Sequence, residues 1–309
     1  MKLGNLSWHG LLPSTLRDEI ALASYKVASG VCILLPRFMG PSIAYVGGSV
    51  AYAISAKKRN VMRANLAPVL GDLDQKRREI AVIKSFASYA QYWYESFKMS
   101  ALSLEELKKY GRGDGMENLY GAIEKGRGAI VVAPHIGNWD FAAAWIDSDR
   151  VKINAVVEAL DPPALFEWFV ARRAHFGIKA IAHNENPMPK LIEAIKRNEV
   201  VVLVADRSLD AASVEVEFFG QKVRFPMGPA FLALRTGAPL LPTASYMEPR
   251  GGHLLRFLPE LEIGERVGLR ADARRLTQMV ATSFEAIIRQ APEQWHVFQP
   301  FFDISPNPS

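Results

Sequence analysis

The sequence predicts an α/β fold: a mixed, largely parallel central sheet flanked by helices, with a helical N-terminal segment that faces a membrane. Three observations lead to this prediction. Beyond residue 110, short apolar runs alternate with helical stretches, which is typical of parallel strands covered by helices. One run, Ala129–Ala133, is apolar throughout, as expected of a strand buried on both faces. The first 70 residues instead combine basic side chains with long apolar stretches.

Length and composition indicate a folded chain with a substantial core. The 309 residues fit one large domain or a core with an added segment, and 49% hydrophobic and 22% charged residues exclude a disordered protein. We expect a helical, membrane-associating front over residues 1–110 and an α/β core over residues 111–309, folded as one structural unit. The single cysteine, Cys32, excludes a disulfide framework and a multi-cysteine metal site, and it favours a reducing compartment. Because charges at positions 17–19 interrupt the apolar character, we expect no signal peptide within residues 1–23.

Positive charge is concentrated near the N-terminus. Residues 1–70 hold eight basic and two acidic residues, whereas the rest of the chain holds 29 basic and 30 acidic ones. Basic residues beside apolar stretches favour an anionic membrane surface as a partner. We expect no nucleic acid partner, because the uncharged stretch Phe38–Ala56 offers no basic face. The same stretch is rich in glycine and serine and makes a poor membrane-spanning helix. We therefore expect attachment to the cytoplasmic face of the cell membrane without a span; packing of this segment on the fold remains the alternative.

Helical spacing and capping signals predict the helices. The stretch Asp74–Met99 repeats apolar residues close to every 3.6 positions. Thr15 with Asp18, and Ser103 with Glu106, have the spacing of a capping box, which marks a helix start. The helices expected in chain order are residues 15–26, Asp74–Met99, a short one after Ser103, Met116–Lys125, Pro163–His175, Pro189–Lys196, Gly228–Thr236 and Arg270–Gln290, followed by the aromatic tail Pro292–Phe302.

Apolar runs bounded by turn residues predict the strands. The expected strands are Ala129–Ala133, Ile153–Val157, Lys179–Ala182, Val200–Ala205 and Leu240–Tyr246. Two hairpins are expected in addition, one from Val214–Phe218 turning at Gly220 and Gln221, and one over Tyr246–Phe257 turning at residues 250–252. These antiparallel pairs make the sheet mixed.

Several common catalytic patterns are missing from the sequence. It contains no G-x-x-x-x-G-K-[ST] loop, no G-x-G-x-x-G after an expected strand, and no G-x-S-x-G nucleophile elbow. The six histidines are scattered, so no pair has metal-ligand spacing. A nucleotide-phosphate enzyme, a serine hydrolase and a zinc enzyme are therefore disfavoured, and no cofactor is expected.

The segment Pro134–Asp140 (PHIGNWD) is the strongest candidate for chemistry. His135 follows a buried strand, at the sheet edge where open α/β folds bind ligands. On one helix His135 and Asp140 would point about 140° apart, but they can meet if His135 lies in the loop, with Gly137 as the turn and Asn138 as the helix cap. Asp140 would then hold the imidazole as a general base for direct attack by a substrate hydroxyl on an activated acyl group. The alternative is that Asp140 only complements the helix N-terminus and His135 is a polar loop residue.

Three motifs in order resemble one enzyme family. His135 and Asp140 form the H-x-x-x-x-D pattern of the glycerolipid acyltransferase superfamily. Together with residues 214–242 (VEVEFFGQKVRFPMGPAFLALRTGAPLLP) and Pro292–Pro300 (PEQWHVFQP), PHIGNWD resembles the bacterial lipid A acyltransferase family, and within it the phosphatidylinositol mannoside acyltransferases. The likeness runs from about Arg59 to Pro300.

This resemblance implies a long-chain acyl-CoA donor, palmitoyl-CoA, and a glycolipid acceptor with a mannose hydroxyl. It implies that His135 is the base and Asp140 its orienting partner, that Glu158 lies near the acceptor sugar, and that Arg173 meets a phosphate or the thioester oxygen. Asp206 and Arg207 stand where the family has an acid–arginine pair. Relatives carry glutamate at the first of these positions and aspartate after the arginine, so Asp206 and Ser208 depart from the pattern.

Other interpretations stay open at this stage. Glu158 can be an ordinary carboxylate at a strand end, and Arg173 can be a solvated helix residue. The donor can be an acylated carrier protein, as for lipid A acyltransferases. The protein can also be a lipid-binding relative without catalysis, although it retains both His135 and Asp140.

Overall fold

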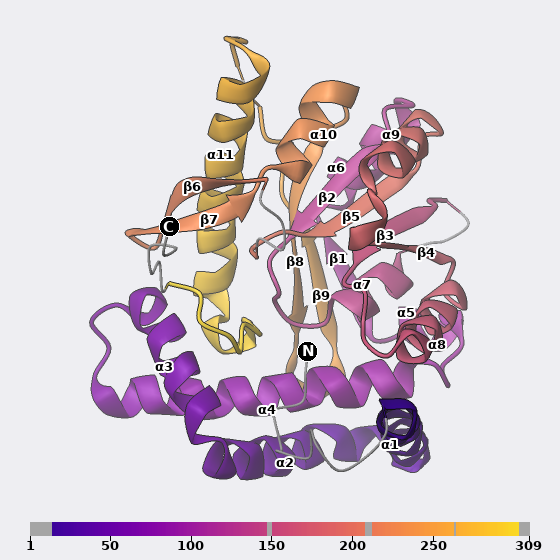
Figure 1. Cartoon of the computed structure of the whole chain (residues 1–309), viewed down its shortest axis with the longest axis vertical. Coiled ribbons are helices and arrows are strands. Elements are labelled where there is room, and N and C mark those ends of the chain that lie inside the picture. The colour runs from indigo at the N-terminus through magenta and orange to yellow at the C-terminus, as the bar shows by residue number, and fades with distance from the viewer. Residues whose placement is uncertain (1–13, 147–149, 208–211, 263, 303–309) are drawn as a thin grey trace.

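The computed structural model describes residues 14–146, 150–207, 212–262 and 264–302. Seven strands form one sheet in the order β1-β9-β8-β2-β5-β3-β4 (Figure 1). β8 and β9 are antiparallel, and the other neighbouring pairs of this sheet are parallel, which confirms the mixed, largely parallel α/β fold. The strands are β1 (Gly111–Asp114), β2 (Ala129–Ala133), β3 (Ile153–Val157), β4 (Ile178–Ala182), β5 (Val200–Val204), β8 (Leu240–Met247) and β9 (His253–Phe257).

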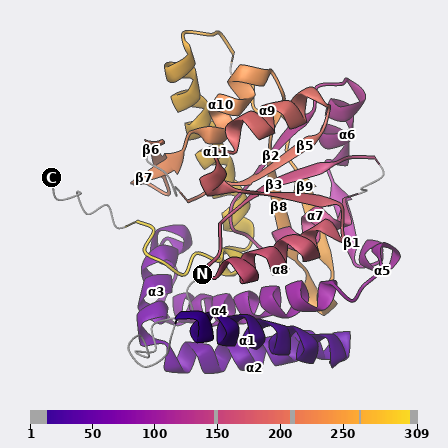
Figure 2. The ribbon, with the colours of Figure 1, turned by 45° about the vertical axis from the view of Figure 1, so that its right-hand side comes forward.

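Helices cover both faces of the sheet, and a separate hairpin packs on one of these helices (Figures 1 and 2). The hairpin, β6 (Ser213–Phe218) with β7 (Gln221–Pro226), is antiparallel as expected and contacts α11. The covering helices are α6 (Met116–Glu124), α7 (Trp139–Trp145), α8 (Pro163–Ala174), α9 (Met188–Lys196), α10 (Gly228–Thr236) and α11 (Leu269–Gln290).

β2 lies at the centre of the core and contacts it on both faces, as its apolar sequence predicts. Ile130 and Val132 belong to the larger apolar cluster, which includes Phe284 of α11. Ala129 and Val131 belong to the cluster on the opposite face, which includes Phe141 of α7. The carboxyl end of β2 is therefore held rigidly from both sides.

The N-terminal segment forms a helical layer at one end of the sheet (Figures 1 and 2). α4 lies between the α/β part and α2, and α1 packs on α4 as well. The approach of α2 to α4 requires glycine at position 48, since a Cβ there would lie 2.5 Å from the Ala87 backbone. The layer consists of α1 (Ser14–Leu34), the short 3₁₀ turn η1 (Arg37–Met39), α2 (Gly40–Ile54), α3 (Ala56–Leu70) and α4 (Gln75–Met99). The short helix α5 (Leu104–Lys108) follows and packs on α7 and β1.

Several elements differ from the sequence-based expectation. α2 and α3 lie in the expected helical front, but the helices predicted from spacing and caps did not include them. The first helix continues from Ser14 to Leu34 instead of ending near residue 26, and the capping side chain expected at Thr15 lies outside the part described. β1 was not expected, because Gly111–Asp114 has no apolar run; it forms by parallel pairing with β9. The capping box of Ser103 and Glu106 is confirmed. The boundary between a front and a core at residue 110 stays a prediction.

Candidate active site

His135 lies in the loop that joins β2 to α7, at the carboxyl end of the strand. β5 is the parallel neighbour of β2, with Ala133 opposite Val204. The residues that follow each strand therefore leave the sheet at the same edge. This register places Asp206 beside His135, although 70 residues separate them in the chain.

The Asp206 carboxylate holds His135 at two points. Its Oδ1 pairs with Nδ1 of the imidazole, and its Oδ2 accepts a hydrogen bond from the His135 backbone N–H at 2.8 Å. The indole Nε1–H of Trp295 donates to the same Oδ2, also at 2.8 Å. Burial by itself raises the pKa of this fully buried carboxyl, but the ring and backbone of His135 and the Trp295 indole hold the pKa below its ordinary value.

The contact with Asp206 determines what His135 can do. An ionised carboxylate only accepts hydrogen bonds, so Nδ1 carries the proton and Nε2 keeps its lone pair. The side chain of His135 is 21% exposed, so this ring is accessible from outside the fold. A histidine with one nitrogen fixed and the other free is arranged as a general base.

The predicted pairing of His135 with Asp140 is wrong. The Asp140 carboxylate accepts hydrogen bonds from Arg173 Nε at 2.8 Å and from the Tyr92 hydroxyl at 2.9 Å. The physical reason is direction: the first turn of α7 turns Asp140 toward α4 and α8, while the strand register supplies Asp206 to the imidazole.

Arg173 is not the solvated helix residue of the alternative interpretation, because its side chain is 17% exposed and bound to Asp140. Its contact with a phosphate or the thioester oxygen stays a prediction. Burial lowers the pKa of the guanidinium, but the charge and hydrogen bonds of Asp140, with Tyr92 beside it, raise it above its ordinary value. The ion pair joins α7 to α8.

The loop after His135 has the turn and the cap that the sequence predicts. Gly137 has φ +59°, and a Cβ there would lie 1.6 Å from the Ser245 carbonyl oxygen, so only glycine fits. The Asn138 side-chain oxygen accepts from Phe141 N at 2.9 Å, which confirms it as the N-cap of α7. The backbone N–H of Gly137 donates to Gln294 O at 3.0 Å and ties the loop to the C-terminal segment.

Aromatic rings surround the imidazole. The Trp139 ring lies 5.3 Å from that of His135 at 82°, and it stacks on Tyr92 with a centroid distance of 4.4 Å. The backbone N–H of His296 donates to His135 O at 2.7 Å. Trp295, in the aromatic tail, is fully buried and also binds Asp206. The signal available in the sequence was its motif, PEQWHVFQP.

Glu158 and Arg207 form a third group, at the ends of the neighbouring strands β3 and β5. Arg207 donates to Glu158 Oε2 at 3.0 Å, and the two side chains are 23% and 45% exposed. The pair lies on the same edge of the sheet as His135, but none of the described hydrogen bonds joins it to His135 or Asp206. The six expected site residues thus fall into three groups, His135 with Asp206, Asp140 with Arg173, and Glu158 with Arg207.

This geometry can be set beside known proteins. The family model described as bacterial lipid A biosynthesis acyltransferase matches residues 16–303. The chain belongs to that family. It is 34% identical over 288 residues, 92% of each chain, to a phosphatidylinositol mannoside acyltransferase of Mycolicibacterium smegmatis. It is 34% identical to one of Mycobacterium tuberculosis, over 77% of this chain and 75% of that one. A lipid A biosynthesis acyltransferase of Haemophilus influenzae is 23% identical over 77% of this chain.

Membership of this acyltransferase family covers nearly the whole described chain. The match begins in α1, well before the Arg59 start of the likeness read from the motifs. Two motifs of this acyltransferase meet at one place in space: Ile136 of PHIGNWD forms an antiparallel bridge with Trp295 of PEQWHVFQP. Among the residues that the structure describes, no three His, Cys, Asp or Glu side chains are grouped to hold a metal ion.

Proposed function

We propose that this acyltransferase moves a long-chain acyl group, palmitoyl, from acyl-CoA to a mannose hydroxyl of a phosphatidylinositol mannoside. The observation that carries the reaction type is the His135–Asp206 pair, which leaves Nε2 as the base. The acceptor is proposed from the names of the mycobacterial relatives, which are 34% identical over most of the chain.

The reaction is a direct transfer between the two substrates. The acceptor hydroxyl gives its proton to Nε2 of His135 while its oxygen attacks the thioester carbonyl carbon. The tetrahedral intermediate expels CoA thiolate, which takes the proton back from His135 and leaves as the thiol. Asp206 stays ionised throughout and stabilises the imidazolium that forms in between.

We assign the acceptor sugar to the rim formed by Glu158 and Arg207. Both side chains are polar and partly exposed, and they lie at the same edge of the sheet as His135. A carboxylate that accepts and a guanidinium that donates suit the hydroxyls of a sugar. Asp140 and Arg173 hold α7 and α8 together and are not assigned to either substrate.

The membrane is proposed to meet the helical layer at its outer side. Large apolar side chains are exposed along α1, η1 and α2. Basic residues that follow α2 in the chain, such as Lys57 and Lys58, favour an anionic surface. No single described helix is long and apolar enough to span a bilayer, although the pair Leu16–Leu34 and Arg37–Ile54, bent by 110°, passes by length and composition. The exposed apolar residues are Leu16, Ile20, Val27, Val31, Ile33, Leu34, Phe38, Met39, Tyr45, Val46, Val50 and Ile54.

A matrix of two donors and two acceptors tests the proposal. Radiolabelled palmitoyl-CoA and palmitoyl carrier protein are each offered with monomannosylated phosphatidylinositol or a lipid A precursor, in anionic vesicles. We expect transfer from palmitoyl-CoA to the mannoside alone. Transfer only from the carrier protein, or only to the lipid A precursor, would replace the proposed donor or acceptor while leaving the family unchanged. Binding of acyl-CoA without transfer or hydrolysis would favour a lipid-binding relative that has lost catalysis.

A further inference from the structure

Asn138 connects the loop that carries His135 to helix α7, and its polar groups are bound on all sides. Its backbone N–H donates to Ser245 O at 3.2 Å, and its carbonyl oxygen accepts from Ser245 Oγ at 2.7 Å. Its side-chain oxygen is used as the cap of α7. The remaining group, the side-chain amide, donates to Glu95 Oε2 at 3.0 Å. Through Glu95, the helical layer holds the loop.

Glu95 accepts from two amides at once. Besides Asn138, the side-chain amide of Gln91, one turn earlier in α4, donates to Oε1 at 2.9 Å. An ionised carboxylate has acceptor lone pairs for both amides, whereas glutamine or a protonated glutamate presents an N–H or O–H to one of them. The grip on Asn138 therefore depends on the charge of Glu95.

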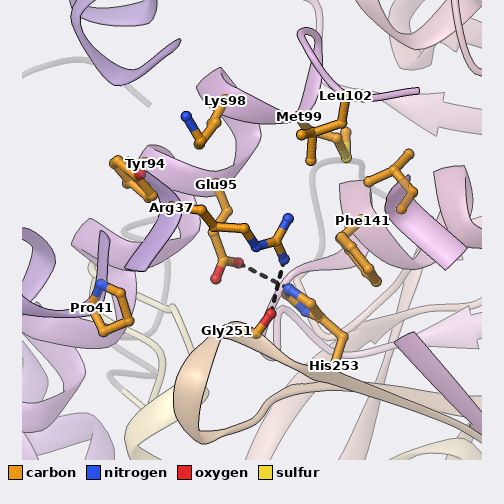
Figure 3. Close-up of a pocket in the computed structure, with 11 residues that line it drawn as sticks. Arg37, Pro41, Tyr94, Glu95, Lys98, Met99, Leu102, Phe141, Gly251 and His253 are labelled. Carbon is orange, nitrogen blue, oxygen red and sulfur yellow. Dashed lines mark hydrogen bonds and ion pairs between the residues drawn. The ribbon is translucent and has the colours of Figure 1, made fainter. Parts of the chain in front are cut away.

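The groups around Glu95 line a small pocket between the helical layer and the sheet (Figure 3). Arg37 donates to Gly251 O at 2.9 Å and reaches in beside Glu95. Tyr94, the preceding residue of α4, also lines the pocket. His253 Nε2 lies 3.3 Å from Glu95 Oε2 without hydrogen-bond geometry. At about 20 Å³, the pocket has room for about one water molecule, so it does not bind a substrate.

Burial in this pocket favours a titration of Glu95 close to neutrality. Burial raises the pKa of its carboxyl to about 7, although Asn138, Gln91 and Arg37 each lower it. Burial, and then the charge of Arg37, lowers the pKa of His253 to about 3, so the ring is neutral where Glu95 titrates. His253 stacks on Phe141 of α7 with a centroid distance of 3.7 Å, so the pocket contacts α7 from this side too.

We infer that Glu95 is a positioning residue for acyl transfer, which as a carboxylate holds Asn138 and thereby the loop that carries His135. It touches neither substrate and acts on the placement of the base. The inference rests on the proposed function, because acyl transfer is the reaction on which Glu95 acts. A loosened loop misplaces Nε2 relative to the acceptor hydroxyl, so kcat falls and KM does not.

The substitution Glu95→Gln, measured against wild type at two pH values, tests this inference. At pH 8 the wild-type carboxyl is mostly ionised, and we expect kcat of the variant to be about tenfold lower with unchanged KM. At pH 6 wild-type Glu95 is itself mostly protonated, so the ratio of wild-type kcat to variant kcat should shrink to about twofold. A ratio that stays constant with pH, or equal kcat values at pH 8, would overturn the inference.

Two further variants separate positioning from general damage. Tyr94 lines the same pocket, and Tyr94→Phe removes its hydrogen bond to Pro36 O. The ratio of kcat between wild type and this variant should therefore not change with pH. Gln91→Met removes a donor to ionised Glu95, so it should raise the pH at which kcat begins to fall. If Glu95→Gln does not fold, Gln91→Met tests the inference in its place. A pH dependence of kcat equal to that of wild type would contradict the inference.

Hydrogen exchange provides a readout that does not depend on transfer. At pH 8, the backbone amides of residues 138–142 should exchange faster in Glu95→Gln than in wild type, after correction for intrinsic rates. At pH 6, the two proteins should exchange at similar rates. If wild type transfers no acyl group, the proposed function fails while this experiment still tests Glu95. Equal protection of that segment at pH 8 would show that Glu95 does not hold the loop.

Discussion

At His135, the partner of the imidazole decides which nitrogen can take a proton. Asp206 binds Nδ1 and the backbone N–H of the same residue, so the ring is fixed in both orientation and tautomer. Trp295 fixes the carboxylate in turn through its indole N–H. The other carboxylate of the motif, Asp140, neutralises a buried arginine instead. The two acids thus have different partners: Asp206 binds the imidazole, and Asp140 binds an arginine of the neighbouring helix.

A pH effect on stability follows from His253, which is 1% exposed. In the unfolded chain this ring takes a proton below about pH 6.5, whereas in the folded protein its pKa is lowered to about 3. The unfolded state binds more protons between these values, so His253 makes stability fall as the pH drops below about 6.5.

His253→Phe should remove this part of the acid sensitivity while keeping the stack on Phe141. We expect the Tm of the variant, relative to wild type, to rise as the pH is lowered from 7.5 to 5. His296, whose pKa is also lowered to about 3, is present in both proteins and cancels. Scanning calorimetry at the two pH values gives the comparison, and a Tm difference independent of pH would contradict it.

At the scale of the element, the β2–α7 loop is what brings these residues together. It contacts three separate parts of the chain: β8 through Ser245, the C-terminal segment through Gln294, and α4 through Glu95. Each contact depends on the tight turn at Gly137, where the backbone passes directly against Ser245. The loop is therefore rigid because of its neighbours, and a small change in it displaces the base.

Gly137→Ala should be costly in both stability and activity. The added Cβ must move the loop away from Ser245, at a backbone conformation that alanine rarely adopts. We expect a loss of at least about 2 kcal/mol of stability and, from displacement of His135, a fall in kcat of roughly a hundredfold. Denaturant unfolding and steady-state kinetics measure the two effects.

Gly121→Ala is the matched control for that experiment. Gly121 lies inside α6 with nothing within 4 Å of the added Cβ, so alanine should raise stability slightly, by up to about 1 kcal/mol. Transfer activity should not change. If Gly137→Ala behaved like this control, the loop would not be the rigid element described.

At the scale of the whole molecule, the helical layer separates the proposed membrane face from the chemistry. α4 is shared: one side packs on α1 and α2, and the other reaches the active site through Tyr92 and Glu95. Large apolar side chains of α1 and α2, such as Val27, Leu34 and Val46, are exposed. Such a surface is expected to sit in the headgroup region of a bilayer, close to lipid-borne substrates.

Phe38→Asp tests the membrane face without disturbing the core, since the side chain is 82% exposed. We expect weaker sedimentation with anionic vesicles and a higher KM for an acceptor in vesicles, with an unchanged Tm. Val267→Asp is the control, because Val267 is 78% exposed but lies just before α11, outside the helical layer. Equal vesicle binding by the two variants would contradict the assignment of this face.

Much of the fold could be predicted because buried parallel strands carry their own signal. Runs such as Ala129–Ala133 and Val200–Val204 are apolar without interruption, and the structure places strands on those residues. β1 has no such run and depends wholly on β9 for pairing. Its existence is a property of the assembled sheet and not of its own residues.

The site was harder to predict because contacts across a sheet depend on strand order. His135 and Asp140 are close in sequence, which favoured pairing them, yet Asp206 is the partner because β5 lies beside β2. Nothing local in Val200–Val204 indicates which strand it will join. Asp206 was noticed only through the family resemblance, and its contact with the imidazole became visible with the register.

Single-turnover transfer by three variants tests the central claim most directly. Palmitoyl-CoA and monomannosylated phosphatidylinositol in vesicles are mixed with wild type, His135→Ala, Asp206→Asn or Asp140→Asn, each checked for folding by circular dichroism. If Asp206 orients the base, His135→Ala abolishes transfer, Asp206→Asn slows it by roughly a thousandfold or more, and Asp140→Asn mainly lowers the Tm, since it weakens a buried ion pair. Rapid transfer by Asp206→Asn, with Asp140→Asn inactive but stable, would contradict the account and return the orienting role to Asp140.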